Sequence, residues 1–210
     1  MSQATKPKGF FGKLLARGMA WGHRGFYKNT ARVADLHPND VYLEIGFGSG
    51  LFIKKYASHV SRIVGLDYSE DMVKLATRLN KDLVESGKAE FFQGEVTSLP
   101  WKENEFSVVV GIETFFFWPR TEVALKEIFR VLLPSGRLVL EMAYNKDDGR
   151  DHTKQAKKHN LKLYSSNEMR MLLKDSGFSD ISFTYFKSLW IPFKGYVVSK
   201  GMIVKAIKFV

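Results

Sequence analysis

Short apolar stretches alternate with amphipathic stretches along this chain, and the alternation restricts its fold more than any other feature. The apolar stretches are rich in β-branched and aromatic residues, as strands buried in a parallel sheet are. Between them, residues 69–87 and 120–136 have helical periodicity, and each ends near a glycine. Strands and helices in regular alternation predict a doubly wound α/β sheet. The first five strands are expected at residues 41–45, 62–67, 90–95, 107–112 and 137–143.

The last third of the chain departs from this alternation. Residues 145–160 are polar and are interpreted as a long loop or insertion, and residues 165–177 as a helix. Two further apolar stretches, 180–186 and 195–200, follow without a helix between them, which predicts an antiparallel hairpin at one edge of the sheet. The expected sheet therefore has about seven strands, most of them parallel.

The composition is that of an ordinary folded domain. The chain has 210 residues, enough for one domain with a full core, and 45% of them are hydrophobic. It contains no cysteine, which excludes disulfides, thiolate metal sites and cysteine nucleophiles, and no metal site is expected. No apolar segment approaches the ~20 residues that span a bilayer, and Lys13 and Arg17 interrupt the run that a signal peptide needs. A cytoplasmic location is therefore expected.

Both ends of the chain are basic, whereas its middle is nearly neutral. The net charge is +10, and residues 1–34 and 181–210 carry seven and five basic residues without an acid. Within residues 10–19 the apolar side chains recur at helical spacing opposite the basic ones, which predicts a basic amphipathic helix. Such a helix either covers a ligand site as a lid, which we favour, or lies on an anionic membrane surface, where the apolar and basic residues 202–210 could assist.

Three glycines at alternate positions follow the first expected strand, in the sequence EIGFGSG. Gly46, Gly48 and Gly50 suit a tight turn in which a ligand approaches the main chain. In a doubly wound sheet, ligands bind beyond the carboxyl ends of the strands, where this turn would lie. A dinucleotide fingerprint would need glycine at the position of Leu51. The turn therefore indicates a different nucleoside site and disfavours an NAD-dependent dehydrogenase.

Acidic residues end the next two expected strands. Asp67 ends the second strand at the distance where a carboxylate accepts hydrogen bonds from ribose hydroxyls, and Glu95 ends the third. A glycine turn and two acids at neighbouring strand ends are a stronger indication of a nucleoside site than any one of them.

These residues resemble the class I S-adenosylmethionine-dependent methyltransferases, in the subgroup that includes small-molecule, quinone and sterol methyltransferases. YLEIGFGSG is similar to the first motif of that family, VGLDYSEDMVKLA to the acidic motif after it, FFQGEVTSLPWKENEFSVVV to the third-strand segment, and ALKEIFRVLLPSGRLVL to the late helix and fifth strand. The resemblance implies a Rossmann-like methyltransferase domain at residues 39–210, with residues 1–38 as an N-terminal helical cap or lid. The family commonly has Asp at the position of Ser107 and Gly-Gly at residues 135–136.

The resemblance implies S-adenosylmethionine as the cofactor, bound at the glycine turn. The main chain of Gly46 and Gly48 would pack against its methionine part, in a turn that Glu44 helps to order. Asp67 would hold the ribose hydroxyls.

Further residues would surround the adenine and the methionine tail. Tyr68 and Met72 would flank the adenine, and Glu95 with Val96 would meet its edge. Met72 and Val96 could equally be plain core residues. The expected cofactor-binding residues are Glu44, Gly46, Phe47, Gly48, Gly50, Asp67, Tyr68, Met72, Glu95, Val96, Gly111 and Ile112.

The acceptor is expected over the ends of the fourth and fifth strands, where the chain reads GIETFFFWPR. The aromatic residues 115–118 could enclose an apolar acceptor or the sulfonium, or they could pack the next helix onto the sheet. Glu113 is a candidate base or acceptor-orienting group, since poor solvation would raise its pKa; alternatively it caps the next turn or bonds the cofactor's amino group. The other candidate catalytic residues are His23, Tyr27 and Tyr144.

The sequence thus predicts transfer of a methyl group by in-line displacement to a small, apolar or aromatic acceptor, at oxygen, carbon or nitrogen. Alternatives are a membrane-associated lipid or quinone methyltransferase, an RNA methyltransferase, and a cofactor-binding module without activity. The basic ends would suit a nucleic acid. However, the Asn/Asp-Pro-Pro-aromatic motif of amino-group nucleic-acid enzymes is absent after the fourth strand, so a nucleic-acid partner is disfavoured. A monomer or a homodimer is expected, with peripheral contact with an anionic membrane as a further alternative.

Overall fold

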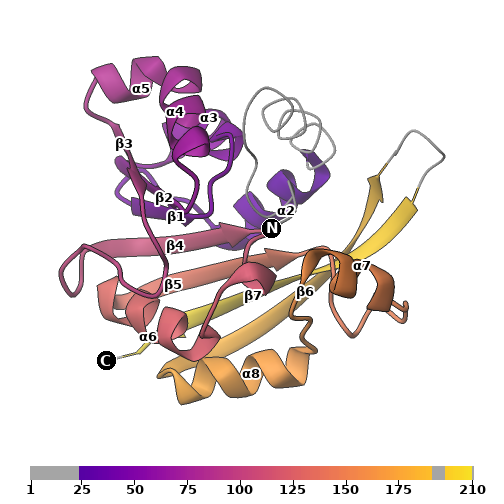
Figure 1. Ribbon diagram of the computed structural model, residues 1–210. Helices are drawn as coiled ribbons and strands as arrows, with labels where there is room; N and C mark the ends of the chain where they lie inside the picture. The colour runs from indigo at the N-terminus through magenta and orange to yellow at the C-terminus, as the bar shows by residue number, and fades with distance from the viewer. Residues whose placement is uncertain (1–23, 191–196, 210) are drawn as a thin grey trace.

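The computed structural model describes residues 24–190 and 197–209. They form a sheet of seven strands in the order β3-β2-β1-β4-β5-β7-β6 (Figure 1). Strands β1 to β5 run parallel, and β7 pairs antiparallel with both β5 and β6. This arrangement confirms the predicted fold class. The strands are β1 (Val41–Ile45), β2 (Arg62–Asp67), β3 (Ala89–Gln93), β4 (Phe106–Ile112), β5 (Leu132–Met142), β6 (Phe178–Trp190) and β7 (Val197–Lys208).

Helices cover both faces of the sheet (Figure 1). Successive strand residues point to opposite faces, so Tyr42 and Val110 belong to the core under α2 to α5, while Leu43 and Val109 belong to the core over α6 and α8. The helices are α2 (Arg24–Ala34), α3 (Leu51–Tyr56), α4 (Glu70–Leu79), α5 (Lys81–Glu85), α6 (Thr121–Val131), α7 (Thr153–His159) and α8 (Ser166–Asp175), with 3-10 turns η1 (Ala57–His59) and η2 (Phe115–Phe117).

The stretch predicted as one helix at residues 69–87 is two helices, α4 and α5, which meet at Asn80. The Asn80 side-chain amide donates to the carbonyl oxygens of Ala76 (2.9 Å) and Gly50 (3.2 Å). Short polar side chains that bond the main chain compete with helix continuation in this way. Asn80 therefore ends α4 and ties it to the glycine turn.

Other boundaries differ from the prediction in smaller ways. The helix predicted at residues 120–136 ends at Val131, because β5 begins at the next residue. The polar stretch 145–160, predicted as a loop, contains α7. Helix α8 begins with a capping box in which Ser165 accepts a bond from the Glu168 amide and Glu168 accepts one from the Ser165 amide.

A buried ion pair closes the amino edge of the sheet. Asp40 precedes β1, and its carboxylate accepts hydrogen bonds from the Arg137 guanidinium of β5, from the Ser107 hydroxyl (2.7 Å) and from the His37 amide (2.7 Å). The guanidinium also donates to the Ala34 carbonyl oxygen, at the end of α2. Ser107, where the related family commonly has Asp, thus serves the fold and not the site.

The C-terminal hairpin is longer than predicted, and its last strand lies inside the sheet. Strand β7 lies between β5 and β6, and Met202, Ile203, Val204 and Ala206 are buried. The buried Lys208 amino group donates to carbonyl and amide oxygens of neighbouring loops and strands. The suggestion that residues 202–210 assist membrane binding does not fit Met202, Ile203, Val204 and Ala206, because these apolar side chains are used in the core, whereas Phe209 is 75% exposed.

The predicted amphipathic helix at residues 10–19 lies outside the described residues, as does His23. Helix α2 packs against β5, β6 and β7, and the Phe26 ring meets Phe186 edge-on at 5.3 Å. The boundary of a cap at residue 38 stays a prediction. Within residues 24–190 and 197–209, no helix has the length and apolarity needed to cross a bilayer.

Candidate active site

The three glycines of the predicted turn all have positive φ angles, of +71°, +54° and +73°. A Cβ atom at Gly46 would lie 2.3 Å from Thr114 Oγ1, and one at Gly50 would lie 2.7 Å from Asn80 Nδ2. A Cβ at Gly48 would meet no atom within 4 Å. Gly46 and Gly50 therefore make room for neighbouring parts of the protein, and Gly48 is the glycine of the three that faces open space.

Asp67, at the end of β2, holds this turn in place. Its two carboxylate oxygens accept hydrogen bonds from the main-chain amides of Gly48 and Ser69, both at 2.8 Å. Burial raises the pKa of Asp67 to about 6, although both hydrogen bonds favour the ionised form. A carboxylate has about four lone-pair sites, so hydroxyl groups of a ligand can still bind to it.

Glu44 lies one strand away from Asp67 and is also buried. Its carboxylate accepts a hydrogen bond of 2.6 Å from the Tyr42 hydroxyl. Burial raises the pKa of Glu44 to about 8, and the charge of Asp67 raises it further. The predicted role of Glu44 in ordering the turn stays a prediction, because its hydrogen-bond partner in the structure is Tyr42.

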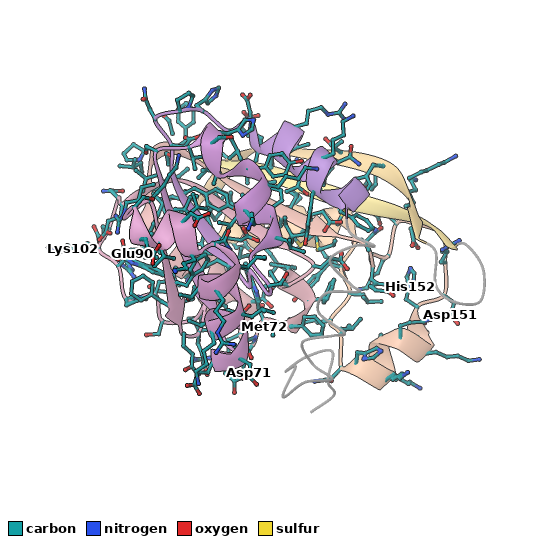
Figure 2. All side chains as sticks on the ribbon, turned by 90° about the horizontal axis from the view of Figure 1, so that it is seen from above. Asp71, Met72, Glu90, Lys102, Asp151 and His152 are labelled. Carbon is teal, nitrogen blue, oxygen red and sulfur yellow. The ribbon has the colours of Figure 1, made fainter. Side chains whose placement is uncertain are left out.

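The residues predicted around the adenine differ in accessibility. Tyr68 and Glu95 are exposed, whereas Met72 and Val96 are 3% and 6% exposed and pack in the two cores. Figure 2 shows Met72 on α4, and Glu95 follows β3 without belonging to it. The interpretation of Met72 and Val96 as core residues therefore fits the structure, and any contact that they make with a cofactor stays a prediction. Phe47, also in the predicted set, packs edge-on against Phe91.

Glu113 follows β4 directly, after Gly111 and Ile112, at the strained φ of +55°. Its carboxylate accepts a hydrogen bond from the Ala143 amide, and its own amide donates to the Glu141 carbonyl oxygen at 3.0 Å. Burial raises the pKa of Glu113 to about 7, as the sequence led us to expect. A carboxyl group with this pKa can donate or accept a proton near neutral pH.

Glu141, near the end of β5, was not singled out from the sequence. It is fully buried, and neither carboxylate oxygen has a hydrogen-bond partner among the residues that the structure describes. Its nearest ionisable neighbour is Glu113. Burial, followed by the negative charge of Glu113, raises the pKa of Glu141 well above its usual value. An acid within the apolar run RLVLEMA was the signal that could have identified it.

Most of the aromatic residues after β4 belong to the core. Phe115, Phe116 and Trp118 are buried, whereas Phe117 is 36% exposed. The Phe115 ring packs edge-on against Trp118, with ring centroids 5.1 Å apart. The interpretation that they pack the next helix onto the sheet is therefore correct for three of the four.

Two tyrosines lie beside the carboxyl groups. Burial raises the pKa of Tyr27, and the charges of Glu44 and Glu141 raise it further, so α2 brings the Tyr27 hydroxyl close to both acids. Burial and then Glu113 raise the pKa of Tyr144. Both tyrosines therefore stay protonated at neutral pH and can donate a hydrogen bond.

A histidine in the polar stretch after β5 was also missed from the sequence. His152 Nε2 lies 2.6 Å from Asp148 Oδ2, and the two side chains are 9% and 0% exposed. The His152 ring packs edge-on against Tyr144 at 5.2 Å. Figure 2 shows His152 beside α7, at the opposite end of the molecule from Glu90 and Lys102. The stretch predicted as an insertion thus packs on the carboxyl edge.

Comparison with known proteins agrees with this geometry. Residues 43–140 match a family model described as a methyltransferase domain. The chain is 31% identical over 121 residues to a ubiquinone/menaquinone biosynthesis C-methyltransferase of Ectopseudomonas mendocina, covering 56% of this chain and 47% of that protein. It is 33% identical over 116 residues to a fatty-acid O-methyltransferase of Mycolicibacterium smegmatis, covering 52% and 39%. The chain thus spans about half the length of the curated relatives that it matches, or less.

Solved structures share the whole fold at low sequence identity. The YcgJ protein of Bacillus subtilis has a TM-score of 0.73 and 16% identity, covering 90% of this chain and 100% of that one. The phosphoethanolamine N-methyltransferase 2 of Haemonchus contortus, solved with S-adenosyl-L-methionine, has a TM-score of 0.76 and 14% identity, covering 93% and 57%.

The sheet, the glycine turn and the acid after β2 define a Rossmann-like protein with a site for a nucleoside-containing cofactor. Residues 43–140 match the methyltransferase-domain family, and the fold is that of the class I S-adenosylmethionine-dependent methyltransferases. The domain match agrees with the family and the cofactor that the sequence predicted.

Proposed function

We propose that this protein transfers the methyl group of S-adenosylmethionine to a small-molecule acceptor with an apolar or aromatic body. The observation that supports this function best is the turn at Gly48, which faces open space and is fixed by Asp67. Ionisable side chains lie at the carboxyl ends of the neighbouring strands β4 and β5, where the acceptor is expected to bind. The carboxyl edge thus offers one region for a cofactor and another for an acceptor.

The residues at this edge fit the cofactor. A side chain at Gly48 would fill the space beside the turn, and Asp67 retains acceptor capacity for ribose hydroxyls. Tyr68 follows Asp67 and is exposed, so its ring is accessible to an adenine ring. The cofactor supplies a methyl group already activated on a sulfonium. The chain's own residues therefore have to hold the acceptor in line and take up its proton, and positioning alone is worth up to ~7–11 kcal/mol.

The curated relatives support an acceptor with an apolar body, since two of them are named for quinone and fatty-acid substrates. Whether the protein acts as a monomer or a homodimer, and whether it contacts an anionic membrane, are further parts of the prediction that oligomer sizing and vesicle binding would test.

Calorimetric titration with S-adenosylmethionine, and separately with NAD, tests the cofactor assignment. Saturable binding of S-adenosylmethionine alone is expected. Asp67→Asn should weaken it at least about tenfold, because one of the acceptor oxygens is lost. Asp82→Asn, at an exposed position of α5, is the matched control and should bind normally. The proposal fails if the folded protein does not bind S-adenosylmethionine, or if no methyl group from the labelled cofactor is transferred to any lipid, quinol, aromatic or amine acceptor.

A further inference from the structure

Two carboxyl groups lie at the ends of two neighbouring strands, with Glu141 fully buried and Glu113 half-buried. Glu141 of β5 pairs in register with Ile112 of β4, and Glu113 is the next residue along. The Glu113 amide donates to the Glu141 carbonyl oxygen at 3.0 Å, and the charge of Glu113 acts on the Glu141 carboxyl group, so the two side chains are close. Among the residues that the structure describes, neither Glu141 oxygen has a hydrogen-bond partner, although the side chain is fully buried. Leaving such a buried group unsatisfied is costly, so it needs an explanation.

The surroundings of this pair are acidic and aromatic. Glu44 of β1 and Tyr27 of α2 lie on the same side of the sheet as Glu141, and Tyr144 lies beside Glu113. In the part of the chain that the structure describes, no Lys, Arg or His forms an ion pair with any of these three acids. A group that bound here would therefore meet negative charge and aromatic rings.

This environment favours a cation and opposes an anion. Methylation of a phenol or quinol proceeds through the phenolate, which neighbouring carboxylates would destabilise. An ammonium group would instead donate hydrogen bonds to both carboxyl groups and gain from the aromatic rings. A metal ion is a poor alternative, since no group of three or more His, Asp or Glu side chains among the described residues is arranged to hold one.

We propose that Glu113 and Glu141 together bind the ammonium group of an amine acceptor and take up its proton. This inference rests on the proposed function and narrows its acceptor to an apolar or aromatic amine. The ammonium first transfers one proton to the Glu113 carboxylate. The nitrogen lone pair then forms the new N–C bond, and the C–S bond of the donor breaks with its electron pair remaining on sulfur. Glu141 completes the hydrogen bonding of the nitrogen and lies beside Glu113.

Binding of simple amines tests the proposal without knowledge of the natural acceptor. The full-length protein is saturated with S-adenosylhomocysteine and titrated with phenethylamine and n-octylamine, and then with 2-phenylethanol, p-cresol and n-octanol. Both amines should bind at least about tenfold more tightly than their hydroxyl counterparts. Glu113→Gln and Glu141→Gln should each reduce amine binding at least about tenfold. Glu122→Gln, at an exposed position of α6, should leave it unchanged.

Proton release gives a second readout of the same binding. An ammonium that binds between Glu113 and Glu141 should displace about one proton at pH 7, and the alcohols should displace none. The ionisable groups facing the pair are Glu44, Tyr27 and Tyr144, and the two tyrosines stay neutral at that pH. Calorimetry in two buffers with different ionisation enthalpies measures the number.

Three results would overturn the inference. The first is that neither amine binds, or that both bind no more tightly than the alcohols. The second is that Glu141→Gln leaves amine binding unchanged. The third is that Glu141→Gln weakens S-adenosylmethionine binding as much as amine binding, which would assign the pair to the cofactor. Failure of the proposed function looks different, because S-adenosylmethionine itself would then not bind to the wild-type protein.

Discussion

The amino and carboxyl edges of the sheet differ in how they hold buried charge. At the amino edge of the sheet, Arg137, midway along β5, forms an ion pair with Asp40, which also accepts a hydrogen bond from Ser107. Burial alone would raise the pKa of Asp40, but these bonds, and that of Arg137 above all, lower it below its usual value. Near the end of β5, Glu141 has no hydrogen-bond partner among the described residues, and burial and the charge of Glu113 raise its pKa.

The buried charges at the amino edge stabilise the fold, whereas those at the carboxyl edge are available to a ligand. At the amino edge, the carboxylate of Asp40 is neutralised and fully hydrogen-bonded within the chain. At the carboxyl edge, neither Glu113 nor Glu141 forms an ion pair within residues 24–190 and 197–209, although removing an acid from water without a cation is costly. Since ligands bind at the carboxyl edge of such sheets, a ligand can supply the missing partner there.

Arg137→Met breaks the amino-edge pair and should have the largest effect on stability. It leaves Asp40 buried without its cation, which typically costs about 3–5 kcal/mol of unfolding free energy. Urea unfolding at pH 7 measures the loss.

Arg62→Met is the matched control for this variant. Arg62 lies 2.9 Å from Glu90, but both side chains are nearly half exposed, at 44% and 46%. Exposed pairs contribute about 0–1 kcal/mol. A loss of similar size in the two variants would contradict the structural role given to Arg137.

The glycine turn allows a second contrast, between two residues of one motif. In Gly46→Ala the new Cβ would lie 2.3 Å from Thr114 Oγ1, and in Gly48→Ala it would meet nothing. In both variants, a side chain at positive φ lowers the free energy of unfolding by about 1–2 kcal/mol. Gly46→Ala should lose more than this, because Thr114 must move and its hydrogen bond from Trp118 is disturbed.

Urea unfolding and S-adenosylmethionine titration of both variants test this contrast. Gly46→Ala should be the less stable protein. Gly48→Ala should lose more cofactor affinity than its loss of stability explains, because the new methyl group occupies the open side of the turn. Equal stability of the two variants would mean that Thr114 does not restrict Gly46.

The cofactor side could be predicted from the sequence because its signals are local. Strands β1 and β2 have their predicted limits, since each is a short apolar run with a clear end. The three glycines lie in the turn after β1, and Asp67 lies at the end of β2. Each signal is therefore contained in one short motif of the sequence. What the sequence did not reveal is that Gly46 makes room for Thr114, a contact between residues far apart in the chain.

The acceptor side could not be predicted because its residues meet only in the folded chain. Glu141 lies within an apolar strand, and its lack of a partner depends on β4 and α2. His152 and Asp148 belong to a polar stretch whose helix, α7, has a weak apolar pattern, so it was interpreted as a loop. Helix α6 ends earlier than predicted because β5 begins at the next residue. The tertiary structure thus overrides the local helix preference.

Glu141→Gln should have the smallest effect on stability at neutral pH, within about 1 kcal/mol. Because burial raises the pKa of Glu141 well above its usual value, the neutral form of the side chain is favoured, and glutamine is a neutral group of similar size. Its amide can donate to Glu113 as the protonated acid can. The effect should appear instead in the pH dependence of stability.

The sign of that dependence follows from the raised pKa values at the carboxyl edge. Glu44 and Glu113 titrate at about 8 and about 7 in the folded protein, against about 4.3 in the unfolded chain. Between these values the folded state binds more protons, so stability is full below about pH 4.3 and falls as the pH rises through 7 and 8. Each such group contributes up to about 1.4 kcal/mol per pH unit. Asp40 has the opposite sign, because its lowered pKa gives stability that is lost only as the pH falls.

Unfolding free energies at pH 5, 6, 7 and 8 therefore distinguish the two edges of the sheet. Wild type should lose stability over this range, and Glu141→Gln should lose less, because one of the groups that release a proton on unfolding is gone. If the variant had the same slope as wild type, Glu141 would be ionised in the folded protein, with a partner that neutralises it. The contrast with Asp40 would then disappear, because both edges of the sheet would hold their charge within the chain.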